Sequence, residues 1–324
     1  PTDQTLGRGI AAQEEATVTV LASALSANHE AGVWASDAGT TVTVEQSLVA
    51  GTLPRPSDQD AGLGILAQEG ASVTVVASAL TANHAVGLSA ASAGTTVTVE
   101  QSLIAGTLLR PSDQDAGQGI AAAQGATVNV LASTMSANHT AGLFAASVGT
   151  TVTVESSLVA ETLPSADGSY GVGVLCTGDV DMSMTGSLVR SSHTAGVLAA
   201  GGCAASLADA HIDGVLPGRF HAWTDSGEIA ATYDGISDGV AVGFGSSATV
   251  TGTRVTGSTR AGLLFDASSG LLVGVSTEGA RYGLVVQGEP KPDYADPTNA
   301  FSGAEEDILT DGALPVPEAP PLPQ

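Results

Sequence analysis

Apolar and polar residues alternate in short runs along most of this chain. In the run TVTV at 17–20, the two valines fall on one side of an extended backbone and the two threonines on the other. Similar runs recur at 41–44, 72–75, 96–99, 127–130 and 151–154. Valine and threonine favour strands, and a period of two is that of a strand with one buried face. The pattern therefore predicts many short strands.

The chain also repeats with a period of 55 residues. The run GTTVTVEQSL occurs at 39–48 and again at 94–103, and RPSDQDAG occurs at 55–62 and 110–117. Each unit holds two turns: the turn from Gly9 to Gly32 has 23 residues, and the next has nine more. The extra residues are rich in Pro, Ser and Asp and predict a loop. A long fixed period is typical of a solenoid.

Three short strands and three corners fit one turn of 23 residues, which is the make-up of a coil in a parallel β-helix. Coils open at Gly9, Gly32, Gly64, Gly87, Gly119, Gly142, Gly173, Gly196, Gly239, Gly262 and Gly283. We predict an all-β solenoid of about eleven coils at 9–288, with an irregular insertion at 208–238. Residues 1–8 are the end of a repeat loop, and 289–324 are a Pro-rich cap or tail in which GAEEDIL at 303–309 could form a helical turn.

From Gly9 to about Gln287 the chain resembles the right-handed, single-stranded parallel β-helices of the pectin-lyase-like class. It is also similar to repeat-rich secreted or surface-anchored proteins of Gram-negative bacteria. The resemblance implies the fold. It does not fix the function, because the class includes lyases, hydrolases, phage tailspikes and adhesins.

The chain is strongly acidic, with 33 Asp and Glu against 9 Lys and Arg, a net charge of −24. This charge argues against nucleic acid and anionic membrane surfaces as partners. No apolar run approaches the ~20 residues that span a bilayer. Residues 1–7 match 56–62, so we expect a fragment or processed form of a longer protein that is extracellular or on the outer cell surface.

The insertion loops contain pairs of carboxylates that suggest a cation site. Asp58 and Asp60 lie in the first loop, and Asp113 and Asp115 lie in the second. Calcium prefers oxygen ligands and normally collects six to eight of them. The same residues also suit an ordinary polar turn, so calcium is one of two interpretations. We expect no other cofactor.

Histidine, asparagine and cysteine recur at corners. The histidines are His29, His84, His139 and His193, and each of the first three follows an asparagine. Histidines two coils apart are separated by ~9.6 Å, too far for zinc bonds of ~2.0–2.1 Å. We expect the histidines to fill corners and the asparagines to satisfy corner backbone groups. Cys176 and Cys203 lie on adjacent coils, either as a disulfide or as two buried thiols.

The insertion at 208–238 is the region densest in chemically active side chains. With two arginines that alignment places at a nearby corner, it gives the candidate catalytic cluster Asp213, Arg219, His221, Asp225, Asp234, Arg260 and Arg281. Trp223 and Tyr233 would supply an aromatic platform, as glycan sites combine carboxylates with aromatics. The alternative is an irregular flap folded over the side of the rod.

One column along the rod is apolar where a solvated strand face would be polar. The third residue of each coil gives Ala11, Trp34, Leu66, Ser89, Ala121, Phe144, Leu175, Leu198, Ala241, Leu264 and Val285. Long apolar patches usually mark contact sites. We therefore predict that the column is covered by the loops, the tail or a second molecule, with Trp34 and Phe144 as ligand contacts. The alternative is that these side chains are simply half-exposed.

Taken together, these features lead us to expect a structural or binding module without catalysis. Its partner would be a glycan or a protein at the cell surface, or a second copy that binds through the apolar column. The alternative from another class is a polysaccharide lyase or glycoside hydrolase. A remote alternative is ice binding through ranks of outward threonines such as Thr17 and Thr19.

Overall fold

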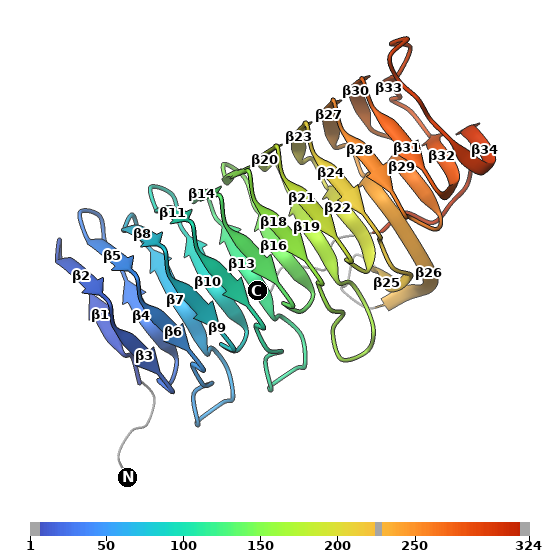
Figure 1. Cartoon of the computed structure of the whole chain (residues 1–324). Helices are drawn as coiled ribbons and strands as arrows, with labels where there is room; N and C mark the ends of the chain where they lie inside the picture. The colour runs from blue at the N-terminus through green and yellow to red at the C-terminus, as the bar shows by residue number, and fades with distance from the viewer. Residues whose placement is uncertain (1–6, 224–228, 318–324) are drawn as a thin grey trace.

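The computed structural model describes residues 7–223 and 229–317, which form a right-handed parallel β-helix (Figure 1). Three sheets run along the rod, and successive coils contribute one strand to each sheet in turn. Every pairing within the stack of coils is parallel, and the eleven strands of the second sheet correspond to eleven coils. The predicted fold and number of coils are confirmed.

Sheet 1 consists of β1 (Ile10–Ala12), β4 (Ala31–Ala35), β7 (Leu63–Gln68), β10 (Val86–Ala91), β13 (Gln118–Ala123), β16 (Ala141–Ala146), β19 (Val172–Thr177), β22 (Thr194–Ala200), β26 (Ile229–Val242), β29 (Ala261–Asp266), β32 (Ala280–Gln287) and β34 (Gly303–Thr310), with β25 (Gly218–Trp223) antiparallel to β26. Sheet 2 consists of β2 (Thr17–Leu21), β5 (Thr41–Glu45), β8 (Ser72–Val76), β11 (Thr96–Glu100), β14 (Thr127–Leu131), β17 (Thr151–Glu155), β20 (Asp181–Thr185), β23 (Ala204–Ala208), β27 (Ser247–Thr251), β30 (Ser269–Val273) and β33 (Pro292–Asp293). Sheet 3 consists of β3 (Ala24–Ser26), β6 (Leu48–Ala50), β9 (Ala79–Thr81), β12 (Leu103–Ala105), β15 (Thr134–Ser136), β18 (Leu158–Ala160), β21 (Leu188–Arg190), β24 (His211–Asp213), β28 (Arg254–Thr256) and β31 (Ser276–Glu278).

The core is a column of small aliphatic side chains inside the three sheets. Val73, Val75, Val97 and Val99 are at most 1% exposed and stack in register, as the alternation predicted. The outward threonines of sheet 2 stack in two ranks, one of which Asn129 interrupts. Val18 is only half-buried because it lies in the first coil. Burial of a valine side chain contributes about 1.5–3 kcal/mol, so the stack as a whole stabilises the rod.

Polar side chains at the corners bind backbone groups that the sheets leave unpaired. Asn138 is 1% exposed; its amide donates to the carbonyl of Ile104 at 3.0 Å, and its oxygen accepts from the backbone N–H of Thr107 at 3.1 Å. Asn83 makes the same pair of contacts two coils earlier. The corner role predicted for the asparagines is confirmed at Asn83 and Asn138, since buried backbone groups need partners, but not at Asn28, whose side-chain nitrogen is buried without a hydrogen-bond partner among the described residues.

The sequence analysis left the state of the two cysteines open and misjudged the segment 303–309. Cys176 and Cys203 form a disulfide with a Cα–Cα distance of 5.9 Å, which links adjacent coils. The segment 303–309 is part of strand β34 and not a helical turn, so that interpretation was wrong. Pairing with the open edge of β32 outweighs local preference, and the exposed acidic side chains of β34 protect the new edge.

Candidate active-site cleft

Four insertions project from the same edge of sheet 1. The first three are loops at 54–61, 109–116 and 164–170, and the fourth is the hairpin of β25 and β26. They occur at every second coil, so they stack beside one another in Figure 1. The part of 208–238 that follows β24 is thus the fourth member of this series, whereas residues 208–213 belong to the regular strands β23 and β24. We call the four insertions the wall.

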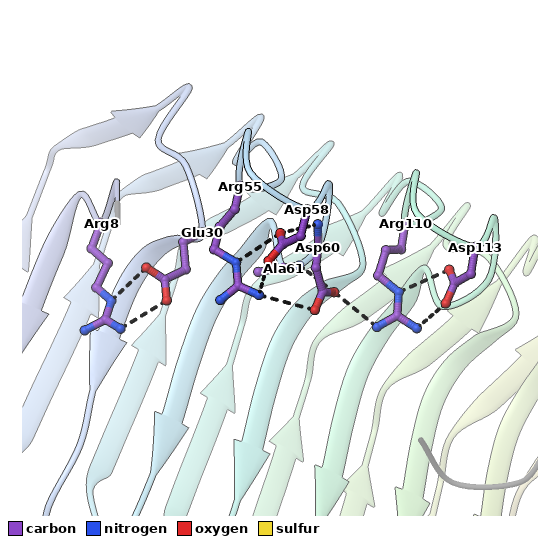
Figure 2. A network of polar contacts seen from close by, with 8 residues as sticks. All are labelled: Arg8, Glu30, Arg55, Asp58, Asp60, Ala61, Arg110 and Asp113. Carbon is purple, nitrogen blue, oxygen red and sulfur yellow. Dashed lines mark hydrogen bonds and ion pairs between the residues drawn. The ribbon is translucent and has the colours of Figure 1, made fainter. Parts of the chain in front are cut away.

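Ion pairs tie the first part of the wall together (Figure 2). Arg55 contacts Asp58 at 3.0 Å and Asp60 at 3.4 Å. Arg110, the equivalent residue one repeat later, contacts Asp113 in its own loop and reaches back to Asp60 at 3.3 Å. Asp60 therefore lies between two guanidinium groups from different loops. The repeated arginine of RPSDQDAG is the signal that our sequence analysis missed.

Hydrogen bonds centred on Asp167 join the third loop to the hairpin. The Asp167 carboxylate accepts from Ser165 Oγ at 2.6 Å, from the Ser169 backbone N–H at 2.9 Å and from His221 Nε2 at 2.8 Å. Burial opposes ionisation here, but these hydrogen bonds prevail and lower the pKa of Asp167. Arg219 completes the junction by donating to the Asp167 carbonyl at 3.0 Å.

A cleft of about 530 Å³ lies between the wall and the outer face of sheet 1. Its floor is the apolar column at Leu66, Ser89, Ala121, Phe144 and Leu175. Its charged lining consists of Glu30, Arg55, Asp60, Arg110 and Asp115. The cleft thus combines an apolar floor with a few polar groups along one side, as small-molecule and glycan sites do.

Asp115 differs electrostatically from the other carboxylates of the wall. Partial burial raises the pKa of Asp115, and the nearby carboxylates of Asp113 and Asp167 add to the increase. Asp115 is nevertheless exposed to solvent. Asp60, one repeat earlier, is instead paired with two arginines. The cleft therefore contains one carboxylate whose pKa is raised and one that is paired with two arginines.

The apolar column has two different halves. Trp34, Leu66 and Phe144 are half-buried, and the guanidinium of Arg8 lies 3.8 Å from the centre of the Trp34 ring. From Leu175 onward the column residues are at most 2% exposed, namely Leu175, Leu198, Ala241, Leu264 and Val285. Leu314 and Val316 of the C-terminal tail pack against this second half. The column is therefore a cleft floor at one end and a covered surface at the other.

The candidate catalytic cluster does not form one site. Asp213 lies on β24 in sheet 3 and accepts a hydrogen bond from Thr256 at 2.6 Å. Arg260 is paired with buried Asp238, and Arg281 with Glu305 at 2.8 Å. Asp213 is on sheet 3, whereas Arg260 precedes β29 and Arg281 lies on β32 of sheet 1, so these three side chains have separate partners.

Only the hairpin members of that cluster come together. Arg219 pairs with Asp234 at 2.6 Å, and His221 faces the third loop. Tyr233 stacks on Phe220 with ring centres 4.9 Å apart, so its ring packs within the hairpin. Asp225 and the side chain of Trp223 lie outside the described residues.

The loop carboxylates do not gather around a point that a cation could occupy. Across residues 7–223 and 229–317, no group of three or more His, Cys, Asp or Glu side chains is arranged to hold a metal ion. Asp58 and Asp113 each turn toward the arginine of their own loop. Calcium normally collects six to eight oxygens, and binding of calcium by these loops stays a prediction that a chelator tests. A separate question is whether the chain could cross a membrane. Among the described residues, no helix is long and apolar enough to do so.

Comparison with known proteins places the chain by fold. No protein-family model and no curated protein matches the sequence. Among solved structures it is similar to a pectate lyase at 10% identity and a TM-score of 0.45, covering 82% of this chain and 74% of that one. A periplasmic alginate epimerase gives 10% identity and a TM-score of 0.48, covering 86% and 76%. The catalytic domain of an α-1,3-glucanase gives 13% identity and 0.47, covering 93% and 60%.

These comparisons correct our main functional expectation. The similar structures are a polysaccharide lyase, an epimerase and a glucanase, which favours the enzyme alternative over a module without catalysis. Neither the non-catalytic module nor ice binding is carried further. Likeness at this identity shows the fold alone, so the activity is argued below from the residues of the cleft.

Proposed function

We propose that the chain is a glycoside hydrolase that cleaves a polysaccharide in the cleft over sheet 1. The observation that carries the proposal is the presence of Asp115 and Asp60 in one cleft. The raised pKa of Asp115 suits a general acid, which must hold its proton until the glycosidic oxygen needs it. Asp60, between Arg55 and Arg110, is the anionic partner.

The backbone spacing of the two residues is nearer to the carboxyl spacing of inverting enzymes than to that of retaining enzymes. Asp60 and Asp115 are equivalent residues of loops two coils apart, so their backbones are separated by about 9.6 Å. Inverting enzymes need carboxyl groups about 6.5–9.5 Å apart to admit a water, and retaining enzymes need about 5–5.5 Å. Asp115 would protonate the leaving oxygen as the bond to the anomeric carbon breaks. Asp60 would take a proton from the water that attacks this carbon from the opposite face.

The charges of the cleft favour a substrate without acidic groups. The lining has three carboxylates against two arginines, and both arginines are already paired. No unpaired cation among these lining residues is left to bind uronate groups or to abstract a proton as a lyase base would. A neutral or amino-substituted polysaccharide avoids repulsion from the wall. Extracellular location fits both such a substrate and the disulfide.

The test is incubation with a panel of neutral glucans, xylan, chitosan, polygalacturonate and alginate. Two products are measured: new reducing ends and the ultraviolet absorbance of unsaturated uronates. We expect reducing ends without this absorbance, and a loss of about 10²–10⁴-fold in rate for Asp115→Asn. Asp181→Asn, at an exposed carboxylate of sheet 2, is the control and should keep full activity. Unsaturated products, or no cleavage of any polymer, would overturn the proposal.

A further inference from the structure

The C-terminal tail runs back over sheet 1 after β34 ends. We call residues 312–317 the strap. The side-chain amide of Gln287 holds the strap at Leu314 by two hydrogen bonds: its nitrogen donates to the Leu314 carbonyl at 2.8 Å, and its oxygen accepts from the Leu314 N–H at 2.9 Å. Gln287 is 6% exposed. Its two hydrogen bonds to Leu314 resemble those that a neighbouring strand would make.

A buried ion pair provides the second anchor. Arg260 is bound to Asp238, which is fully buried, and its remaining terminal nitrogen donates to the carbonyl of Pro315 at 2.7 Å. Buried charges are stable only when their hydrogen bonds are satisfied. The strap carbonyl therefore supplies a partner that the Arg260 guanidinium would otherwise lack within the protein.

Apolar contacts also hold the strap against sheet 1. Leu314 and Val316 pack on the covered half of the column. A Cβ atom added at Gly243 would come within 2.8 Å of Val316 Cγ1, so the glycine makes room for the strap. Leu314 contacts coil eleven through Gln287, whereas Pro315 and Val316 contact coil nine through Arg260 and Gly243. The strap thus runs toward the cleft along the same column that forms the cleft floor.

We propose that the second half of sheet 1 is a binding channel for an extended peptide, and that the strap is its occupant from the same chain. The two hydrogen-bonding anchors hold main-chain atoms, which any extended peptide offers, and the apolar floor selects the Leu and Val side chains. A role as end cap does not explain the strap, because β34 already covers β32 of the last coil. The channel and the cleft floor lie on the same apolar column, at its two ends. This inference goes beyond the proposed hydrolase and stands without it.

The test uses a shortened chain that ends at Asp311 and a labelled peptide of residues 312–324. Fluorescence anisotropy should show saturable binding to the shortened chain and at least tenfold weaker binding to the full chain, whose channel is occupied. Gln287→Leu in the shortened chain should weaken binding at least tenfold, because it removes both hydrogen bonds to Leu314. A peptide with Asp in place of Leu314 is the control and should not bind. Equal binding to both chains would overturn the proposal, as would no binding to a shortened chain that is folded.

A second measurement applies if the shortened chain does not fold. In the full chain, Leu314→Asp should release the strap, and hydrogen exchange at the backbone N–H of residue 314 should rise at least tenfold while exchange in β11 stays unchanged. Ala313→Asp changes an exposed neighbour and serves as the matched control. Unchanged exchange at residue 314 in the Leu314→Asp variant would show that the channel does not select that side chain, which contradicts the proposal.

Discussion

Replacement of Asn138 by alanine tests how far corner side chains stabilise the β-helix. In the native chain its amide satisfies the Ile104 carbonyl and the Thr107 N–H, and its oxygen also accepts from the Thr107 hydroxyl at 2.7 Å. The site is 1% exposed, so water cannot replace these contacts. Each orphaned buried group costs about 1–3 kcal/mol, which gives about 2–6 kcal/mol for the two backbone groups.

The assay is urea unfolding, with Asn129→Ala as a matched control. Asn129 lies in the same coil on the outer face of β14, where it is half-buried, and its loss should change the free energy of unfolding by less than about 0.5 kcal/mol. Because a repeat array need not unfold in one step, exchange at the Thr107 N–H is measured as well. Equal midpoints for the two variants, with unchanged exchange at Thr107, would refute the reasoning.

Four further outcomes are expected. Replacing Cys176 and Cys203 by serine should lower the free energy of unfolding by about 3.5 kcal/mol, since the bridge closes a loop of 27 residues; urea midpoints would show it. The pKa of Asp167 is lowered in the fold, so its stabilising contribution is present above its unfolded value of about 3.9 and is lost as pH falls below it. Limited proteolysis of the hairpin should therefore rise below about pH 4, and Asp167→Asn should show this already at pH 6. Val73→Asp buries an unpaired carboxylate and should lower the melting temperature sharply, at a cost of several kcal/mol (~2–7); an unchanged melting temperature would mean that the strand faces are swapped. EDTA should leave the melting temperature unchanged, whereas a calcium-dependent rise would identify a cation site in the loops.

The fold was predictable because the same pattern of short strands recurs in several repeats of the sequence. The alternation in TVTV places Val97 inside and Thr98 outside, and the same run two coils away must obey the same geometry. Stacking then fixes which residues are neighbours, as the register of Thr96 with Ser72 and Thr127 shows. A local preference at 303–309 failed, because sheet pairing at the end of the rod is a tertiary contact that composition does not reveal.

The site was less predictable because it depends on contacts between insertions. The sequence showed two carboxylates in each loop, Asp60 and Asp115 among them, but it does not show that Arg110 reaches back across two coils to Asp60. Loop conformations follow no period, so the sequence pattern does not identify the partner of each loop side chain. The cluster at 208–238 was proposed because its polar residues are close together in the sequence. They are not all close in space, since Asp213 lies on sheet 3.

The third loop gives a reason to regard the charged wall as more than a by-product of repetition. Its segment LPSADGSYG has lost the arginine that stands at positions 55 and 110 of the earlier loops, yet it keeps a carboxylate at Asp167. The hairpin, the fourth insertion of the wall, brings Arg219 and His221 to this loop. A repeat that served only to stack coils would need no replacement partner there, because the sheet pairing of β18 with β21 is intact without it. The replacement keeps the wall joined beyond the point where the sequence repeat decays. A continuous wall is what a cleft for a long, regular polymer requires, and an isolated loop pocket would have no use for it.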